Sequence, residues 1–230
     1  MKKRPKLCNS ISQTAQVGGW AYYVFELLFL PSLLLTLAAK LGVGDAVVNF
    51  VYYLLNFFFC VSIFRDFLSD SLDAAGKHMA AFVRAVALGF LCHWGVNALM
   101  GMLIARFAPD FANVNDQAIA VMTAQHPLLM TIGTVLLVPV AEEGLFRGLI
   151  FSQLHPKSRT AAYAVSVLAF GLIHVMGYVG LYPPATLALC ILQYIPAGLI
   201  FAWAYEHCGS ILAPILIHTA VNAVAFFALR

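Results

Sequence analysis

Long apolar runs alternate with short polar segments along the chain, and this pattern predicts membrane-spanning helices. A helix of about 20 predominantly apolar residues crosses the hydrocarbon core of a bilayer. By that measure the pattern predicts seven spans, at residues 20–41, 46–64, 80–104, 127–151, 160–178, 185–205 and 210–229. The polar segments between them are too short to form a separate soluble domain, so we expect one helical membrane domain over residues 1–230.

The composition strengthens this prediction. Hydrophobic residues make up 62% of the chain and charged residues only 10%, whereas a soluble domain carries about 25% charged residues. We therefore expect an all-α, polytopic membrane protein. Within it, residues 1–19 form a basic N-terminus, residues 20–106 form three accessory spans, and residues 127–229 form a four-helix core that holds nearly all the polar groups of the spans.

The basic residues predict the orientation of these spans. With the N-terminus in the cytoplasm, most of them fall in cytoplasmic segments: Lys2, Lys3, Arg4, Lys6, Arg65, Lys77, Lys157 and Arg159. Only Lys40, Arg106 and Arg230 then lie outside, as the positive-inside rule requires. The net charge of +3 thus follows from topology and gives no reason to expect a nucleic-acid partner. No small-residue cleavage site follows the first apolar run, so we expect that span to be retained.

The five cysteines exclude two classes of site. They contain no Cys-x-x-Cys pair and most lie within predicted spans: Cys8, Cys60, Cys92, Cys190 and Cys208. This distribution is typical neither of a disulfide framework nor of a thiolate metal site. We interpret them as small apolar packing residues.

Three charged residues interrupt the fourth span. Glu142, Glu143 and Arg147 lie in a segment that is otherwise uncharged from residue 128 to residue 151. Charged groups at this depth usually face a protein interior or a cavity and mark function. Glu143 and Arg147 are four residues apart and share one helix face, while Glu142 projects about 100° away from them. The group is either a buried ion cluster that fixes helix packing or part of a functional site.

Two later spans contribute polar side chains. His174 lies among apolar neighbours in the fifth span, and His218 and Asn222 lie four residues apart in the seventh. Each could be a hydrogen-bonded packing group between helices or a member of a site. The spacing alone is weak evidence, because His93 and Asn97 in the third span repeat it.

Depth in the membrane brings these groups together. At about 1.5 Å per residue, Glu142, His174 and His218 each lie roughly 12 to 21 Å from the cytoplasmic end of their helices. They can therefore meet in one cavity. A desolvated Glu can take a proton from water, and His and Asn side chains can donate hydrogen bonds to a developing oxyanion. Such a set suits hydrolysis of an amide bond.

The ordered motifs resemble a known family. Glu-Glu-x-x-x-Arg at residues 142–147, Phe-x-x-x-His at 170–174 and His-x-x-x-Asn at 218–222 resemble the CAAX prenyl protease type II and bacteriocin-processing (CPBP) family of intramembrane glutamic endopeptidases. Gln193, Gly198 and the Gly-Ser-Ile entry to His218 are also similar to family sequence. The resemblance covers roughly residues 127–229, and the first three spans match only as generic membrane helices.

The resemblance implies roles for individual residues. Glu142 would activate water with the help of His174, while His218 and Asn222 would form the oxyanion site. Glu143 and Arg147 would be a supporting pair.

The resemblance also bears on cofactors. The family has been described both as metallopeptidases and as glutamic peptidases without a metal, and we favour the metal-free mechanism. The alternative is a zinc ion held by Glu142, His174 and His218 with an open fourth position. The chain has no His-Glu-x-x-His motif, and no carboxylate partner for either histidine is evident from the sequence.

One departure from the family and three functions remain open. Many relatives carry Asn where this chain has Gly177, which puts full activity or the usual specificity in question.

We expect an intramembrane endopeptidase acting on peptides or membrane proteins in the bilayer of a prokaryotic plasma membrane. The alternatives are a non-catalytic immunity or scaffold protein of the same fold, and a proton-coupled transporter.

Overall fold

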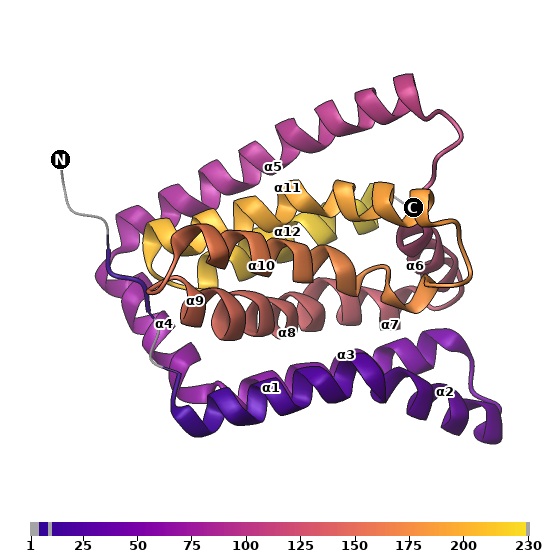
Figure 1. Ribbon diagram of the computed structural model, residues 1–230, viewed down its shortest axis with the longest axis horizontal. Helices are drawn as coiled ribbons and strands as arrows, with labels where there is room; N and C mark the ends of the chain where they lie inside the picture. The colour runs from indigo at the N-terminus through magenta and orange to yellow at the C-terminus, as the bar shows by residue number, and fades with distance from the viewer. Residues whose placement is uncertain (1–4, 9–10, 229–230) are drawn as a thin grey trace.

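The computed structural model describes residues 5–8 and 11–228, and these residues are built almost entirely from helices (Figure 1). The first half contains α1 (Gln13–Leu28), α2 (Leu30–Leu41), α3 (Asp45–Ile63), α4 (Arg65–Lys77) and α5 (Met79–Phe107). The predicted ends at residues 1–4 and 229–230, with the basic residues that they hold, lie outside the described residues. The prediction of an all-α, polytopic membrane protein is confirmed.

The second half begins with α6 (Val114–Gln125) and continues into one long helix of changing pitch. That helix consists of α7 (Pro127–Thr131), the π-helical segment η1 (Ile132–Leu137), α8 (Val138–Glu143), a second π-helical segment η2 (Gly144–Phe151) and α9 (Ser152–Leu154). It is followed by α10 (Arg159–Ile173), the short 3-10 turn η3 (Met176–Tyr178), α11 (Pro184–Cys208) and α12 (Leu212–Ala228).

The long helix with α8 at its centre lies inside the bundle. It packs on α3 on one side and on α10 and α12 on the other, while α11 packs against α10, α5 and α12. Figure 1 shows α1 and α3 along one flank of the bundle and α5 along the opposite flank. The core therefore surrounds the segment in which the sequence places its adjacent glutamates.

Length and hydropathy support fewer full spans than the seven predicted. Four helices are long and apolar enough to cross a membrane: α3, α5, α11 and the helix over residues 127–154. The bent pair α1 and α2 would make a fifth, and α10 and α12 are apolar but shorter. The bend of 51° lies at residues 29–30, next to Pro31 in the first turn of α2, where proline cannot donate a backbone hydrogen bond.

Three segments differ from the predicted pattern. The fifth predicted span continues to residue 178, but α10 ends at Ile173 and the chain turns at His174. The segment between the third and fourth predicted spans contains the helix α6, whose N-cap Asn113 accepts from the backbone N–H groups of Asn115 and Asp116. A polar helix, α4, also follows α3 directly.

Gly144 allows α3 to approach the long helix closely. A Cβ at this position would clash with Sγ of Cys60 on α3, although it would stand 3.7 Å from Cβ of Cys60. We predict that Gly144→Ala lowers stability by about 1–3 kcal/mol, the usual cost of overpacking. Adding Cys60→Ala removes the clashing sulfur and should restore most of the loss. Thermal unfolding of the single and double variants in detergent checks this, and equal melting temperatures for wild type and Gly144→Ala would contradict it.

Candidate functional site

The carboxylates of the long helix lie between its two π-helical segments. α8, which carries Glu142 and Glu143, is preceded by η1 and followed by η2. Pro139 contributes to this irregularity because it has no N–H group and cannot continue regular helical hydrogen bonding. π-Helical turns within α-helices occur frequently at functional sites. Glu142 and Glu143 therefore lie in a part of the helix whose pitch departs from that of a regular α-helix.

Glu143 and Arg147 form a buried ion pair, as their spacing predicts. Both side chains are fully buried, and Nη1 of Arg147 lies 3.1 Å from Oε1 of Glu143. Nη2 of Arg147 donates to the carbonyl oxygen of Gly198 on α11 at 2.9 Å. The guanidinium also lies over the ring of Phe170 on α10, 4.7 Å from its centroid. This pair therefore ties the long helix to both neighbouring helices.

His218 contacts both glutamates. Its Nδ1 lies 3.0 Å from Oε1 of Glu143, and its Nε2 lies 4.0 Å from Oε2 of Glu142. No carboxylate partner for this histidine was evident from the sequence, and the structure supplies one in Glu143. The ring therefore lies between the two carboxylates. The side chain of His218, which α12 carries, is only 6% exposed.

His174 approaches Glu142 from the C-terminal end of α10. Its Nδ1 lies 2.7 Å from the carbonyl oxygen of Phe170. A carbonyl oxygen can only accept a hydrogen bond, so Nδ1 carries the proton. Nε2 then faces Glu142, 3.9 Å from its Oε1. Both candidate histidines therefore use Nδ1 for orientation and direct Nε2 at the same carboxylate.

Glu142 differs from its neighbour in what its oxygens contact. Glu143 is fully buried and paired, whereas the side chain of Glu142 is 20% exposed. Among the described residues, Oε2 of either glutamate has no hydrogen-bond partner, but Oε1 of Glu143 binds Arg147 and His218, whereas the contacts of Glu142 to the two histidines are 3.9 and 4.0 Å long. The structure thus brings Glu142, His174 and His218 together around a carboxylate that is free to bind another group.

Asn222 has a separate contact. Its Nδ2 donates to the carbonyl oxygen of Thr134 in η1 at 2.8 Å. That carbonyl lacks a helical partner, because the N–H of Val138 goes to Gly133 and Pro139 has no N–H. Asn222 therefore satisfies a backbone group that the π-helical segment leaves free. One N–H of its amide remains for a second acceptor.

The other His-x-x-x-Asn pair lies outside this cluster. Asn97 lies 3.3 Å from Nδ1 of His93 on the same helix, α5. The ring of His93 is stacked at 6.1 Å from that of Phe201, whose centroid lies 4.8 Å from that of His218. The repeated spacing therefore gives a local pair behind the site and no contact with Glu142.

A further buried carboxylate escaped the sequence analysis. Glu26 on α1 is only 3% exposed, and its Oε1 accepts from the hydroxyl of Tyr52 on α3 at 2.7 Å. The accessory helices therefore do more than present apolar surface. The signal for this was a single Glu within the first apolar run.

The proposed zinc ligands are not arranged as a metal site. Within residues 5–8 and 11–228, no group of three His, Cys, Asp or Glu side chains could hold a metal ion. The two histidine nitrogens lie 3.9 and 4.0 Å from different oxygens of Glu142. In a tetrahedral zinc site with bonds of about 2.0–2.1 Å, ligand atoms lie roughly 3.4 Å apart. Zinc would require these side chains to move closer together.

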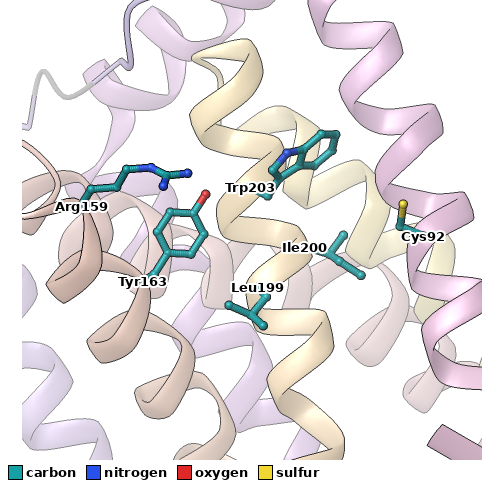
Figure 2. Close-up of a pocket in the computed structure, with 6 residues that line it drawn as sticks. All are labelled: Cys92, Arg159, Tyr163, Leu199, Ile200 and Trp203. Carbon is teal, nitrogen blue, oxygen red and sulfur yellow. The ribbon is translucent and has the colours of Figure 1, made fainter. Parts of the chain in front are cut away.

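A cavity of about 420 Å³ lies on another part of the molecule (Figure 2). It is lined by Cys92 of α5, Arg159 and Tyr163 of α10, and Leu199, Ile200 and Trp203 of α11. None of the candidate site residues lines it. Arg159 is bound there to Glu206, with Nε donating to Oε1 at 2.6 Å and Nη2 to Oε2 at 2.9 Å. This cavity is thus separate from the Glu142 cluster.

Comparison with known proteins supports the resemblance seen in the motifs. Residues 124–224 match the family model described as type II CAAX prenyl endopeptidase, Rce1-like. The matched segment contains Glu142, Glu143, Arg147, His174, His218 and Asn222. No curated protein and no solved structure gives a significant match. The family is one of proteases, and the match supports peptidase activity in general.

Proposed function

We propose that this membrane protein, whose residues 124–224 match the Rce1-like type II CAAX prenyl endopeptidases, is an intramembrane endopeptidase. One observation carries the proposal: the partly exposed carboxylate of Glu142 faces Nε2 of both His174 and His218. An ion cluster that only stabilises helix packing is complete with Glu143 and Arg147. It does not require the carboxylate of Glu142, which forms no ion pair with Arg147. Cleavage of membrane-associated peptides by purified protein is the direct test.

In the proposed mechanism, Glu142 and His174 hold the attacking water. A water about 2.8 Å from both Oε1 of Glu142 and Nε2 of His174 would subtend roughly 90° across their separation, which suits two hydrogen bonds. Nδ1 of His174 donates to a carbonyl oxygen, so Nε2 is free to accept a hydrogen bond from one O–H of the water, and that hydrogen stays on the oxygen. Glu142 takes the other proton as the oxygen attacks the peptide carbonyl carbon. The proton then passes from Glu142 to the leaving amine.

His218 is the proposed donor to the oxyanion. When both of its ring nitrogens carry a proton, His218 donates from Nδ1 to Glu143, and its Nε2–H points into the site and can donate to the carbonyl oxygen as that oxygen gains charge. We propose Asn222 as the second donor, through the amide N–H that Thr134 leaves unused. Glu143 and Arg147 hold His218 and the long helix in place around Glu142.

We propose that this reaction proceeds without a metal. Cleavage by purified protein is then expected to be unchanged, within about twofold, after incubation with a strong chelator and removal of the chelated ions. The physical reason is that Glu142 and the two histidines would supply both the base and the oxyanion donor. Loss of cleavage after chelation, followed by recovery on addition of zinc, would contradict the metal-free mechanism and leave Glu142, His174 and His218 as ligands.

Substrate and location belong to the same proposal. We propose that the N-terminus is cytoplasmic and that the protein works in a prokaryotic plasma membrane, because its loops are short and its basic residues gather on one side. Leader peptides and small membrane proteins then suit a site at this depth better than prenylated C-terminal peptides. A library containing lipidated and unlipidated versions of the same peptides distinguishes these classes.

A further inference from the structure

The ring of His174 lies against Tyr194 on α11. The two ring centroids are 4.0 Å apart and the planes are inclined by only 23°, so the rings are stacked. On another side, the ring of Phe170 contacts His174 edge-on at 4.9 Å. Tyr194 was not among the residues that the sequence singled out.

The hydroxyl group of Tyr194 is held by a different segment. It donates to Oδ1 of Asp116 at 2.9 Å and accepts from Nδ2 of Asn115 at 3.1 Å. The neighbouring Gln193 accepts from Nδ2 of Asn113 at 2.8 Å. The first turn of α6 and its N-cap therefore bind α11 at the level of His174. Figure 1 shows α6 at the end of the bundle toward which α10 runs.

His174 needs such a contact because of its place in the chain. Ile173 is the last residue of α10, and His174 is followed by a turn. Its Nδ1 hydrogen bond to Phe170 fixes one ring atom, but the χ2 torsion of histidine is broad and has no sharp minimum of its own. A stacked neighbour restricts rotation about that torsion. The direction of Nε2 toward Glu142 thus depends on Tyr194.

We infer that Tyr194 is a positioning residue for His174, and that Asn115 and Asp116 act on the site by fixing the Tyr194 hydroxyl. This inference rests on the proposed function for its catalytic consequence, while the contact itself does not. A residue needed only for packing would require the ring and not the hydroxyl. Here the hydroxyl has two partners on α6, so α6 is coupled to a side chain inside the bundle.

The inference predicts a graded series of effects on kcat. Tyr194→Phe keeps the stacked ring but removes all hydrogen bonds of its hydroxyl to α6, and Asp116→Ala removes the closest of those partners; each should lower kcat about 3- to 10-fold. Tyr194→Leu removes the ring and should lower kcat about 100-fold, since a misplacement near 1 Å can cost that much. KM should stay within about twofold in all three, because none of the groups touches the peptide. The double variant of Tyr194→Phe and Asp116→Ala should be no worse than either single variant.

The experiment pairs kinetics with a direct reading of the His174 ring. Protein labelled at its seven histidines is placed in lipid nanodiscs, and the His174 ring signals are assigned by NMR with His174→Gln. Stacking on Tyr194 should shift these signals upfield. Tyr194→Phe should retain the shift but broaden the signal, and Tyr194→Leu should abolish it. Tyr182→Phe is the matched control, because its hydroxyl has no hydrogen bond among the described residues; it should change neither signal nor kcat.

Each outcome decides the inference separately from the proposed function. If the His174 signal shows no dependence on Tyr194 or Asp116, the positioning role is wrong whatever the activity. If the signal follows the series but kcat does not, Tyr194 packs against His174 without serving the reaction. If wild-type protein cleaves nothing while the signal follows the series, the proposed function is wrong and the coupling between α6 and His174 stands. Asp116 is exposed in the structure, so Asp116→Ala keeps the test available even if Tyr194→Leu does not fold.

Discussion

Glu142→Gln is expected to abolish peptide cleavage, with kcat reduced about 100- to 10,000-fold, the range that a general base contributes. Glutamine preserves the shape of the side chain but cannot take a proton from water. Because Glu142 makes no ion pair closer than the histidine contacts at 3.9 and 4.0 Å, the variant should fold normally. The measurement is cleavage of a library of membrane-associated peptides by purified wild-type and variant proteins at equal concentration.

The melting temperature in detergent serves as the control for this variant. An unchanged melting temperature together with lost cleavage assigns the effect to chemistry. If Glu142→Gln cleaves the same peptides as wild type, Glu142 is not the base and the mechanism is wrong. If wild type cleaves nothing while Glu142→Gln supports the cellular phenotype of the gene, the immunity or scaffold role replaces the peptidase.

Arg147→Met is expected to have the largest effect on stability, about 3–5 kcal/mol, as for other buried pairs broken on one side. The substitution leaves the fully buried Glu143 without its cation and the carbonyl of Gly198 without its donor. It also removes the guanidinium from the face of Phe170. Thermal unfolding in detergent, with yield of folded protein as a second measure, checks the prediction.

Two further variants separate charge from packing. Adding Glu143→Gln to Arg147→Met removes the unpaired charge and should restore part of the stability. The matched control is Arg65→Met, because Arg65 and Asp66 form a pair whose side chains are 81% and 83% exposed, and such pairs contribute about 0–1 kcal/mol. If Arg65→Met and Arg147→Met lower the stability equally, the burial of the Glu143–Arg147 pair does not increase its contribution to stability, and the prediction is wrong.

The parts of the site that the sequence could predict are those set by spacing within one helix. Glu143 and Arg147 meet because a four-residue separation places them on one face. The shared depth of Glu142, His174 and His218 was also accessible, because rise per residue converts position into height. Distances along one helix are fixed by its geometry, and these expectations needed nothing more.

The contacts between helices were not accessible in this way. His218 binds Glu143, Asn222 binds Thr134, and Tyr194 binds Asp116, each across a separation that leaves no local pattern. His93 and Asn97 have the same spacing as His218 and Asn222 but contact each other. Which faces meet is decided by packing, and no periodicity in a single helix encodes the rotation of its neighbour.

The end of α10 shows a different kind of error. Apolar residues continue past Ile173, so hydropathy extended the span to residue 178. The turn signals lay in Gly177 and Gly180, and Gly180 adopts a φ of +83°, a left-handed conformation that glycine adopts without steric cost. Apolar character reports burial in lipid or protein, and it does not report where a helix stops. The turn matters because it places His174 at a helix end.

The two π-helical segments also determine which glutamate has which role. Glu142 and Glu143 are chemically identical, and only about 100° of helical phase separates the carboxylate that faces the histidine Nε2 atoms from the one that pairs with Arg147. A π-helical turn contains more residues than an α-helical one, so η1 sets the phase between the part of the helix that packs on α3 and the part that carries the glutamates. Deleting one residue between 132 and 137 would rotate the glutamates by about 100° around the helix axis relative to the part that packs on α3. Insertions and deletions in this apolar stretch are therefore expected to be far more damaging than apolar substitutions at the same positions.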